Sequence, residues 1–179
     1  MRPPIPIPTS REISPLIIEA CRTVVANPNP VHVPVRLDVY SNDEDCHRNV
    51  AEKIRRDGGR ASSGWVIWEI PDWEIQLEFH SVWQGNQGSP VDVSPPLHGG
   101  PEVLFLPDPI RVYEGRNISS IHYPYDDSER CREYVDVADK INRVIFPPGK
   151  PGKSPFVPTA EMAALQARLR DIFIKAKQS

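Results

Sequence analysis

Cysteine and glycine are scarce in this chain of 179 residues, which holds 3 cysteines and 10 glycines against 21 prolines. The cysteines, at positions 21, 46 and 131, are too few and too widely spaced for the disulfide framework of a small secreted protein. Their odd number also leaves at least one free thiol. We therefore expect a protein of the reducing cytoplasm, with long proline-rich connections and modest regular structure.

Long hydrophobic runs and an excess of basic charge are also absent. The longest apolar runs, such as residues 103–106, are far too short to cross a bilayer. The first residues lack the apolar stretch of a signal peptide. The formal net charge of −3 gives no attraction for nucleic acid or an anionic membrane surface. We expect neither as a partner, and the sequence carries no signal for oligomeric state.

The remaining composition is that of a soluble globular protein, with 39% hydrophobic and 25% charged residues. The length predicts a single domain over residues 1–179. Within it we expect a proline-rich lead-in over residues 1–10. A proline- and glycine-rich linker over residues 147–158 should lead to a C-terminal helix.

Hydrophobic periodicity predicts an α+β fold, in which a small antiparallel sheet packs against a cysteine-bearing helix and is flanked by N- and C-terminal helices. Steps of three and four residues indicate helices over 14–26, 45–56, 128–144 and 160–177. Alternating and β-branched stretches indicate strands over 31–39, 64–70, 73–80, 91–94 and 102–106. Between the last strand and the next helix, residues 107–127 are expected to be irregular.

Cys46 falls in the first turn of the helix predicted over 45–56. Ser41 and Glu44 have the spacing of a capping box at its start, and the aspartates beside Glu44 are alternative caps. The unpaired N–H groups and the dipole at a helix start stabilise a thiolate and lower its pKa. The acidic residues of this turn oppose that effect, so a nearby cation is needed to activate Cys46.

His80 and Asp92 are predicted to lie on one face of two neighbouring strands. His80 belongs to the polar side of its strand, and Asp92 stands between two valines that face the core. A three-residue loop over 85–87 would place the two side chains directly opposite each other. A carboxylate holds a neighbouring imidazole in one tautomer and stabilises its cation, and that cation could pair with the Cys46 thiolate.

This set of residues resembles the transglutaminase-like core of the papain-like cysteine enzymes. A cysteine at a helix start precedes a strand with the sequence HSVW at 80–83, and the next strand carries VDVSP at 91–95. The order cysteine, histidine, aspartate along the chain is that of the family. The resemblance covers about residues 41–95.

The resemblance implies that Cys46 is the nucleophile, His80 the general base and acid, and Asp92 the orienting carboxylate. The implied activity is acyl transfer or amide hydrolysis through a Cys46 thioester, as in peptidases, amidases, deamidases and transglutaminases. A protein or peptide amide is then the expected substrate, and no cofactor or metal is needed. Candidates for the substrate cleft are Asn42, as a possible oxyanion contact, Trp65 and Trp83.

Two other functions stay open at this point. One is a non-catalytic module of papain-like shape that binds a protein or peptide in its cleft. The other is a zinc-binding domain that uses Cys46, His80 and Asp92, with His47 and His98 as further residues of ligand type. The sequence lacks the C-x-x-C and H-x-x-x-H spacings of common structural zinc sites.

The remaining candidates have simpler structural interpretations. Cys21 lies on the apolar stripe of the first predicted helix and is expected in the core, and Cys131 is expected to take part in helix packing. His47 follows Cys46 directly and is expected to point elsewhere from the helix and to face solvent.

Overall fold

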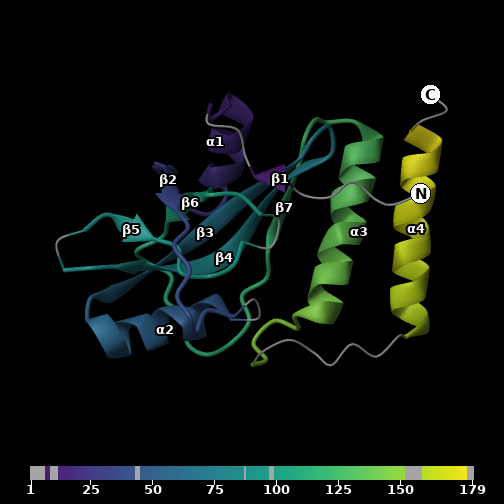
Figure 1. Ribbon diagram of the computed structural model, residues 1–179. Helices are drawn as coiled ribbons and strands as arrows, with labels where there is room; N and C mark the ends of the chain where they lie inside the picture. The colour runs from purple at the N-terminus through teal and green to yellow at the C-terminus, as the bar shows by residue number, and fades with distance from the viewer. Residues whose placement is uncertain are drawn as a thin grey trace. The chain divides into compact units, whose positions relative to one another are not determined.

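The computed structural model describes residues 7–8, 12–42, 45–86, 88–96, 99–151 and 159–176. By their contacts, the described residues form two compact units: a larger one within 7–68 and 77–113, and a smaller one within 69–76 and 114–176. Figure 1 shows the helices and strands with their labels. Both units are mixtures of helix and strand, which confirms the α+β fold class.

The first helix of the larger unit, α1, spans Pro15–Arg22. The side chain of Ser14 accepts a hydrogen bond from the N–H of Ile17 and so caps the helix. Pro15 occupies the first helical position, where its missing N–H would have no partner within the helix. The buried side of α1 includes Cys21, which is completely inaccessible, as expected for a core residue.

The second helix, α2, spans Cys46–Asp57, so Cys46 is its first residue. Asp45 is the N-cap, because its carboxylate accepts a hydrogen bond from the N–H of Arg48 at 3.0 Å. Gly58 ends the helix with a φ of 71°, a backbone conformation that favours glycine. In the view of Figure 1, α1 lies above the long strands of this unit and α2 below them.

The capping box predicted for α2 is therefore wrong in one of its two residues. The hydroxyl of Ser41 accepts the N–H of Asp38 at 2.9 Å and donates to the carbonyl oxygen of Val93 at 2.6 Å, and Asp45 takes the capping role. Glu44, the other residue of the box, lies outside the described residues.

The strands of the larger unit are β1 (Ile7–Pro8), β2 (Val31–Pro34), β3 (Arg60–Ile70), β4 (Glu74–Gln84), β5 (Pro90–Val91) and β6 (Glu102–Pro107). Strands β3, β4 and β6 are longer than the periodicity indicates, β2 and β5 are shorter, and β1 is not predicted. Their order in the sheet is β2-β6-β3-β4-β5, and β1 pairs with β3. Strands β2 and β3 both pair antiparallel with β6, and β4 pairs antiparallel with β5. Neighbouring strands thus follow the antiparallel arrangement expected from the sequence.

The two edges of this sheet come together directly after β2 and β5. Val35 and Asp92 form an isolated parallel bridge. The N–H of Asp92 donates to the carbonyl oxygen of Pro34 at 2.9 Å, and the N–H of Arg36 donates to the carbonyl oxygen of Asp92 at 2.8 Å. The sheet is consequently almost closed, and Asp92 lies at the point of closure.

Both faces of the sheet are buried, which the alternation in the sequence did not indicate. One face carries an apolar cluster: Val33, Val66, Trp68, Val82, Val103 and Phe105. His80 lies on the same face of β4 as Val82, two residues away. On β4 this face also carries Gln76 and Glu78, which are partly exposed like His80, so His80 lies on the polar side of its strand as predicted, next to the apolar cluster.

The smaller unit pairs a short strand with two helices. Strand β7 (Ile121–Pro124) pairs with β4, although it falls in a segment that the sequence predicts to be irregular. Helices α3 (Glu129–Ile145) and α4 (Ala160–Ala176) pack on each other, and Ser128 and Thr159 accept N–H groups at their starts.

The core of the smaller unit combines three aromatic and three aliphatic residues: Trp73, Tyr134, Phe173, Ile70, Val137 and Ile172. Cys131 is completely buried in α3, and its thiol donates to the carbonyl oxygen of Asp72 at 3.3 Å. In the described part of the chain, no helix is both long enough and apolar enough to cross a membrane.

Candidate active site

His80 and Asp92 are in direct contact. His80 Nε2 lies 3.0 Å from Asp92 Oδ2, and only 13% of the His80 side chain and 1% of the Asp92 side chain are exposed. The other oxygen of Asp92, Oδ1, accepts the N–H of Ser94 at 2.9 Å. The carboxylate is thus fixed by two hydrogen bonds away from solvent, which gives it a defined orientation toward the imidazole.

The strand register differs from the predicted one, yet the contact forms. Gln84 pairs with Pro90, so the loop spans residues 85–89 rather than 85–87. Asp92 follows the last residue of β5, and it lies diagonal to His80 rather than directly opposite. A change of two positions in register keeps every side chain on its face, and a diagonal pair is still within reach of an imidazole.

Cys46 completes the cluster at the start of α2. Burial raises the pKa of its thiol, but hydrogen bonds and positive charge from His80 and His47 outweigh burial and lower the pKa from 9.0 to about 6. Burial lowers the pKa of His80, but the Cys46 thiolate and the Asp92 carboxylate raise it well above 6.5. The favoured state is therefore a thiolate–imidazolium pair.

The two nitrogens of the His80 ring have separate partners. Asp92 occupies Nε2, so Nδ1 is the nitrogen that remains for the hydrogen bond to Cys46. Sulfur, imidazole and carboxylate consequently form a chain of the type found in thiol and serine hydrolases. Cys46 as a whole residue is partly exposed, unlike Cys21 and Cys131, which are buried.

His47 also belongs to the site, and the prediction that it faces solvent is wrong. Its Nδ1 lies 2.7 Å from the hydroxyl of Ser81, and its ring stacks on Tyr113 with centroids 3.5 Å apart and planes at 7°. Phe79 touches it from β4 with centroids 5.8 Å apart. His47 and His80 both lower the pKa of the Cys46 thiol, so two imidazoles act on it.

Tyr113 is the site residue for which the sequence offered no signal. It lies in the segment predicted to be irregular, far from the motifs. Burial raises the pKa of its hydroxyl, and the nearby negative charges of Asp45 and Cys46 raise it further. His47 could have been found, because it directly follows Cys46 and is itself a titratable residue.

Asn49 links the cysteine helix to the segment that carries Asp92. It is 1% exposed and lies one turn after Cys46 on α2. Its Nδ2 donates to the carbonyl oxygen of Asn42 at 2.7 Å and to the hydroxyl of Ser94 at 3.2 Å, and its Oδ1 accepts the N–H of Asn42 at 3.1 Å. Because Ser94 in turn binds Asp92, one buried amide connects α2 with the carboxylate.

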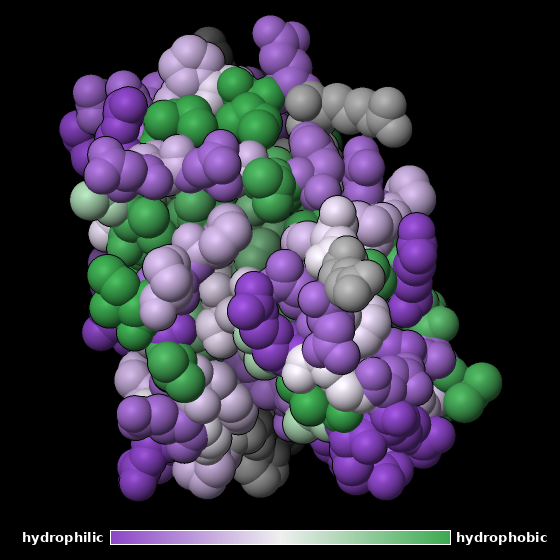
Figure 2. Space-filling view, turned by 90° about the vertical axis from the view of Figure 1, so that its left-hand side faces the viewer, coloured by the Kyte–Doolittle hydropathy of each residue, from purple (hydrophilic) through white to green (hydrophobic). Residues whose placement is uncertain are grey.

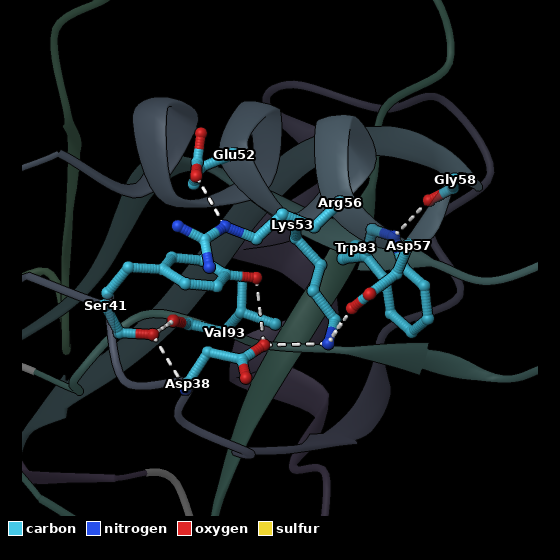
Figure 3. Close-up of polar contacts among 10 residues, drawn as sticks. Asp38, Ser41, Glu52, Lys53, Arg56, Asp57, Gly58, Trp83 and Val93 are labelled. Carbon is cyan, nitrogen blue, oxygen red and sulfur yellow. Dashed lines mark hydrogen bonds and ion pairs between the residues drawn. The ribbon is translucent and has the colours of Figure 1, made fainter.

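A surface network fastens the segment before α2 to the middle of that helix (Figure 3). Lys53 lies between two carboxylates, with its Nζ 2.7 Å from Asp38 and 2.5 Å from Asp57. Asp38 is joined through its backbone N–H to Ser41, whose hydroxyl binds the backbone of Val93. These contacts hold residues 38–41 against α2 and against the backbone of Val93.

The three cleft candidates lie in different surroundings. Asn42 is held by its backbone against Asn49, close to the start of α2. Trp65 is completely buried, so it cannot wall an open cleft as proposed. The indole of Trp83 donates to the carbonyl oxygen of Gly58 at 2.9 Å, at the far end of α2, about 18 Å along the helix axis from Cys46.

The described residues contain no set of ligands that would support the zinc alternative. There, no group of three or more histidines, cysteines, aspartates and glutamates is placed to hold a metal ion. His98, one of the residues of ligand type, lies outside the described part of the chain.

Comparison of the chain with protein-family models, with curated proteins and with solved structures found no match.

Proposed function

We propose that this protein is a cysteine enzyme that cleaves or transfers acyl groups from protein or peptide amides through a thioester on Cys46. The observation that carries the proposal is the chain of contacts from the thiol to His80 and on to the buried carboxylate of Asp92. The reaction at Cys46 would then be that of transglutaminase-like cysteine hydrolases and transferases.

The resting state of such an enzyme would be charged near neutral pH. With the pKa of Cys46 lowered to about 6 and that of His80 raised, sulfur carries a negative charge and the imidazole a positive one. Asp92 favours the cation and keeps the ring oriented. A thiolate is the nucleophilic form of cysteine, so the site is charged for attack before substrate arrives.

In the first half of the reaction, the Cys46 thiolate attacks the amide carbonyl carbon, and the carbonyl π electrons move to oxygen. The intermediate collapses when His80 donates its proton to the amide nitrogen, so the C–N bond breaks and the amine leaves. The products are the free amine, a Cys46 thioester and a neutral His80.

The second half regenerates the enzyme. Neutral His80 takes a proton from water or from an amine, which attacks the thioester carbonyl, and the C–S bond breaks to restore the thiolate. Water yields an acid and an amine yields a new amide. The N–H groups of the first turn of α2 have no partners within the helix, which makes those of Cys46 and His47 candidate donors to the oxyanion.

The acyl-enzyme is the species to test for. The full chain would be mixed with a peptide 4-nitrophenyl ester, and its intact mass and peptide map would be recorded. We expect one acyl adduct on Cys46, none in Cys46→Ala, and an unchanged adduct in Cys131→Ala. Methylamine would then distinguish transfer from hydrolysis by the amide it forms. Absence of any adduct on folded wild-type protein would favour the non-catalytic binding module.

A further inference from the structure

Several large apolar side chains reach the surface, and they include two pairs that each share a short segment, Leu37 with Val39 and Ile110 with Val112. Ile110 is 91% exposed and Val112 is 66% exposed. Figure 2 shows apolar and hydrophilic groups side by side on one face of the molecule, so single exposed apolar residues are common here. The pair at 110 and 112 stands out because its segment, residues 108–113, ends at the candidate active site.

Asp108 holds the start of this segment. Its side chain is buried, Oδ2 accepts the indole N–H of Trp65 at 3.1 Å, and Oδ1 accepts the N–H groups of Ile110 at 3.2 Å and Arg111 at 3.1 Å. A carboxylate that binds the backbone two and three residues further on fixes a turn. The loop therefore leaves β6 in a defined direction.

The side chain between the two aliphatic residues is turned back onto the protein. The Arg111 guanidinium lies over the ring of Trp65, 5.1 Å from its centre, and 4.0 Å from Asp108. Ile110 and Val112 are exposed aliphatic side chains of the turn. The two aliphatic side chains are thus exposed on an ordered loop, whose arginine contacts Trp65 and Asp108 instead.

Tyr113 holds the other end of the segment against the site. Its ring stacks on His47, and the negative charge of Cys46 contributes to the raised pKa of its hydroxyl. Val112 is bonded to Tyr113, and Ile110 lies at most about 11 Å along the chain from it. A bound peptide advances about 3.3 Å per residue, so both aliphatic side chains lie within about three substrate residues of the Tyr113 end of the loop.

We propose that the loop 108–113 is the substrate-binding loop of the Cys46 site and selects peptides with a bulky aliphatic residue at or next to the acyl group transferred. The inference rests on the proposed function. Two exposed aliphatic side chains bind apolar groups by removing both surfaces from water. A charged or glycine-rich substrate would leave them hydrated, so leucine, isoleucine or valine is the expected side chain.

The experiment compares three peptide chloromethyl ketones that differ in one side chain: Gly-Gly-Gly, Gly-Gly-Leu and Gly-Leu-Gly. Each alkylates a thiolate when sulfur displaces chloride. We expect the faster leucine reagent to modify Cys46 about tenfold faster than the glycine reagent, the usual size of aliphatic discrimination. In Ile110→Ser/Val112→Ser, this rate ratio should fall close to one.

The matched control is Val39→Ser. Val39 is 99% exposed, but its neighbours Asp38 and Tyr40 contact Lys53 and Arg56, about 10 to 15 Å along α2 from Cys46. This variant should keep the wild-type rate ratio. A ratio near one in the wild type, or an unchanged ratio in the double variant, overturns the proposed loop function. Iodoacetamide separates the two hypotheses: if it does not label Cys46 selectively, the proposed enzyme function fails, and the loop assignment fails with it.

Discussion

Cys46 combines two features that oppose each other in most proteins, burial and ionisation. Burial alone raises the pKa of a thiol, as it does at Cys21, where the pKa rises to about 12. At Cys46 the same penalty is present, but hydrogen bonds and positive charge from two histidines exceed it. The lowered pKa of Cys46 therefore arises from its two histidine neighbours.

The pH dependence of alkylation follows from this difference. A lowered pKa means that the Cys46 thiolate persists above about pH 6 and is lost as the pH falls through that value. We expect iodoacetamide to label Cys46 with a midpoint at about 6, whereas Cys21 and Cys131 stay unlabelled in the folded protein because both are completely buried. Peptide mass mapping after brief treatment measures this, and a midpoint near that of an ordinary thiol, about 8.5, would refute the ion pair.

Asp92→Asn tests the orienting carboxylate. The change removes the negative charge that favours the His80 cation, and so it should weaken the stabilisation of the thiolate. We expect alkylation of Cys46 at its wild-type midpoint to slow about fivefold, which corresponds to a rise of one unit in the pKa of the thiol. His80→Ala should slow it at least as much.

The double variant shows whether the two residues act together. Members of one functional unit are not additive, so Asp92→Asn combined with His80→Ala should be no slower than His80→Ala alone. Thermal melting serves as the control for folding, because Asp92 is buried. If folded Asp92→Asn keeps the wild-type rate of Cys46 alkylation, the carboxylate has a purely structural role.

His47→Gln tests the second imidazole. Glutamine can keep a hydrogen bond to Ser81, but it has no positive form and cannot stack on Tyr113 as an imidazole does. The alkylation midpoint of Cys46 should rise, but by less than in His80→Ala, because His80 is the stronger of the two influences on the thiol. An equal or larger rise in His47→Gln would reverse the roles assigned to the two histidines.

At the scale of elements, the site depends on how α2 is attached to the segment after β5. Helix α2 supplies the thiol, and the segment after β5 supplies the carboxylate. No strand pairing joins the two. Asn49 connects them through Asn42 and Ser94. One buried amide thus has three hydrogen bonds to lose if it is replaced.

Asn49→Ala should therefore destabilise the protein and disturb the site together. The backbone of half-buried Asn42 and the hydroxyl of buried Ser94 would each lose hydrogen bonds to Asn49, which costs about 1 to 3 kcal/mol in the free energy of unfolding. Urea denaturation measures this loss. The neighbouring exposed side chain offers a control, because Arg48→Ala should change stability by no more than about 0.5 kcal/mol. Equal stabilities of the two variants would contradict the linking role of Asn49.

At the scale of the molecule, every residue of the candidate site belongs to the larger of the two units. The smaller unit has its own aromatic core around Trp73 and Phe173, and it contains a buried pair in which His122 Nδ1 lies 2.8 Å from Glu74 Oε2. The chemistry proposed for Cys46 uses none of these residues. The smaller unit is accordingly packed around a core of its own.

Metal dependence is a property of the whole chain that separates the enzyme from the zinc alternative. His80 and Asp92 already bind each other in the structure. We expect the purified protein to carry no stoichiometric zinc and to keep its melting temperature in the presence of EDTA. Stoichiometric zinc, with a melting temperature that falls on chelation, would favour a zinc site, because metal binding energy is folding energy.

Much of the fold was predictable because its signals are local. Helix starts at Ser14, Ser128 and Thr159 follow from side chains that bind N–H groups two or three residues away. Strands β3, β4 and β6 follow from alternation or β-branched stretches. The missed element, β7, has only 4 residues, and partnership with β4, not its own composition, makes it a strand.

The sequence by itself determined that Cys46 begins a helix, because caps and periodicity act within a few residues. It also determined that His80 and Asp92 share a face, because alternation along strands survives any change of register by two. Only the tertiary structure decided the longer loop, the closure of the sheet at Asp92, and the stacking of Tyr113 on His47. The reason is physical: these contacts join residues far apart in the chain, and their geometry depends on how whole elements pack.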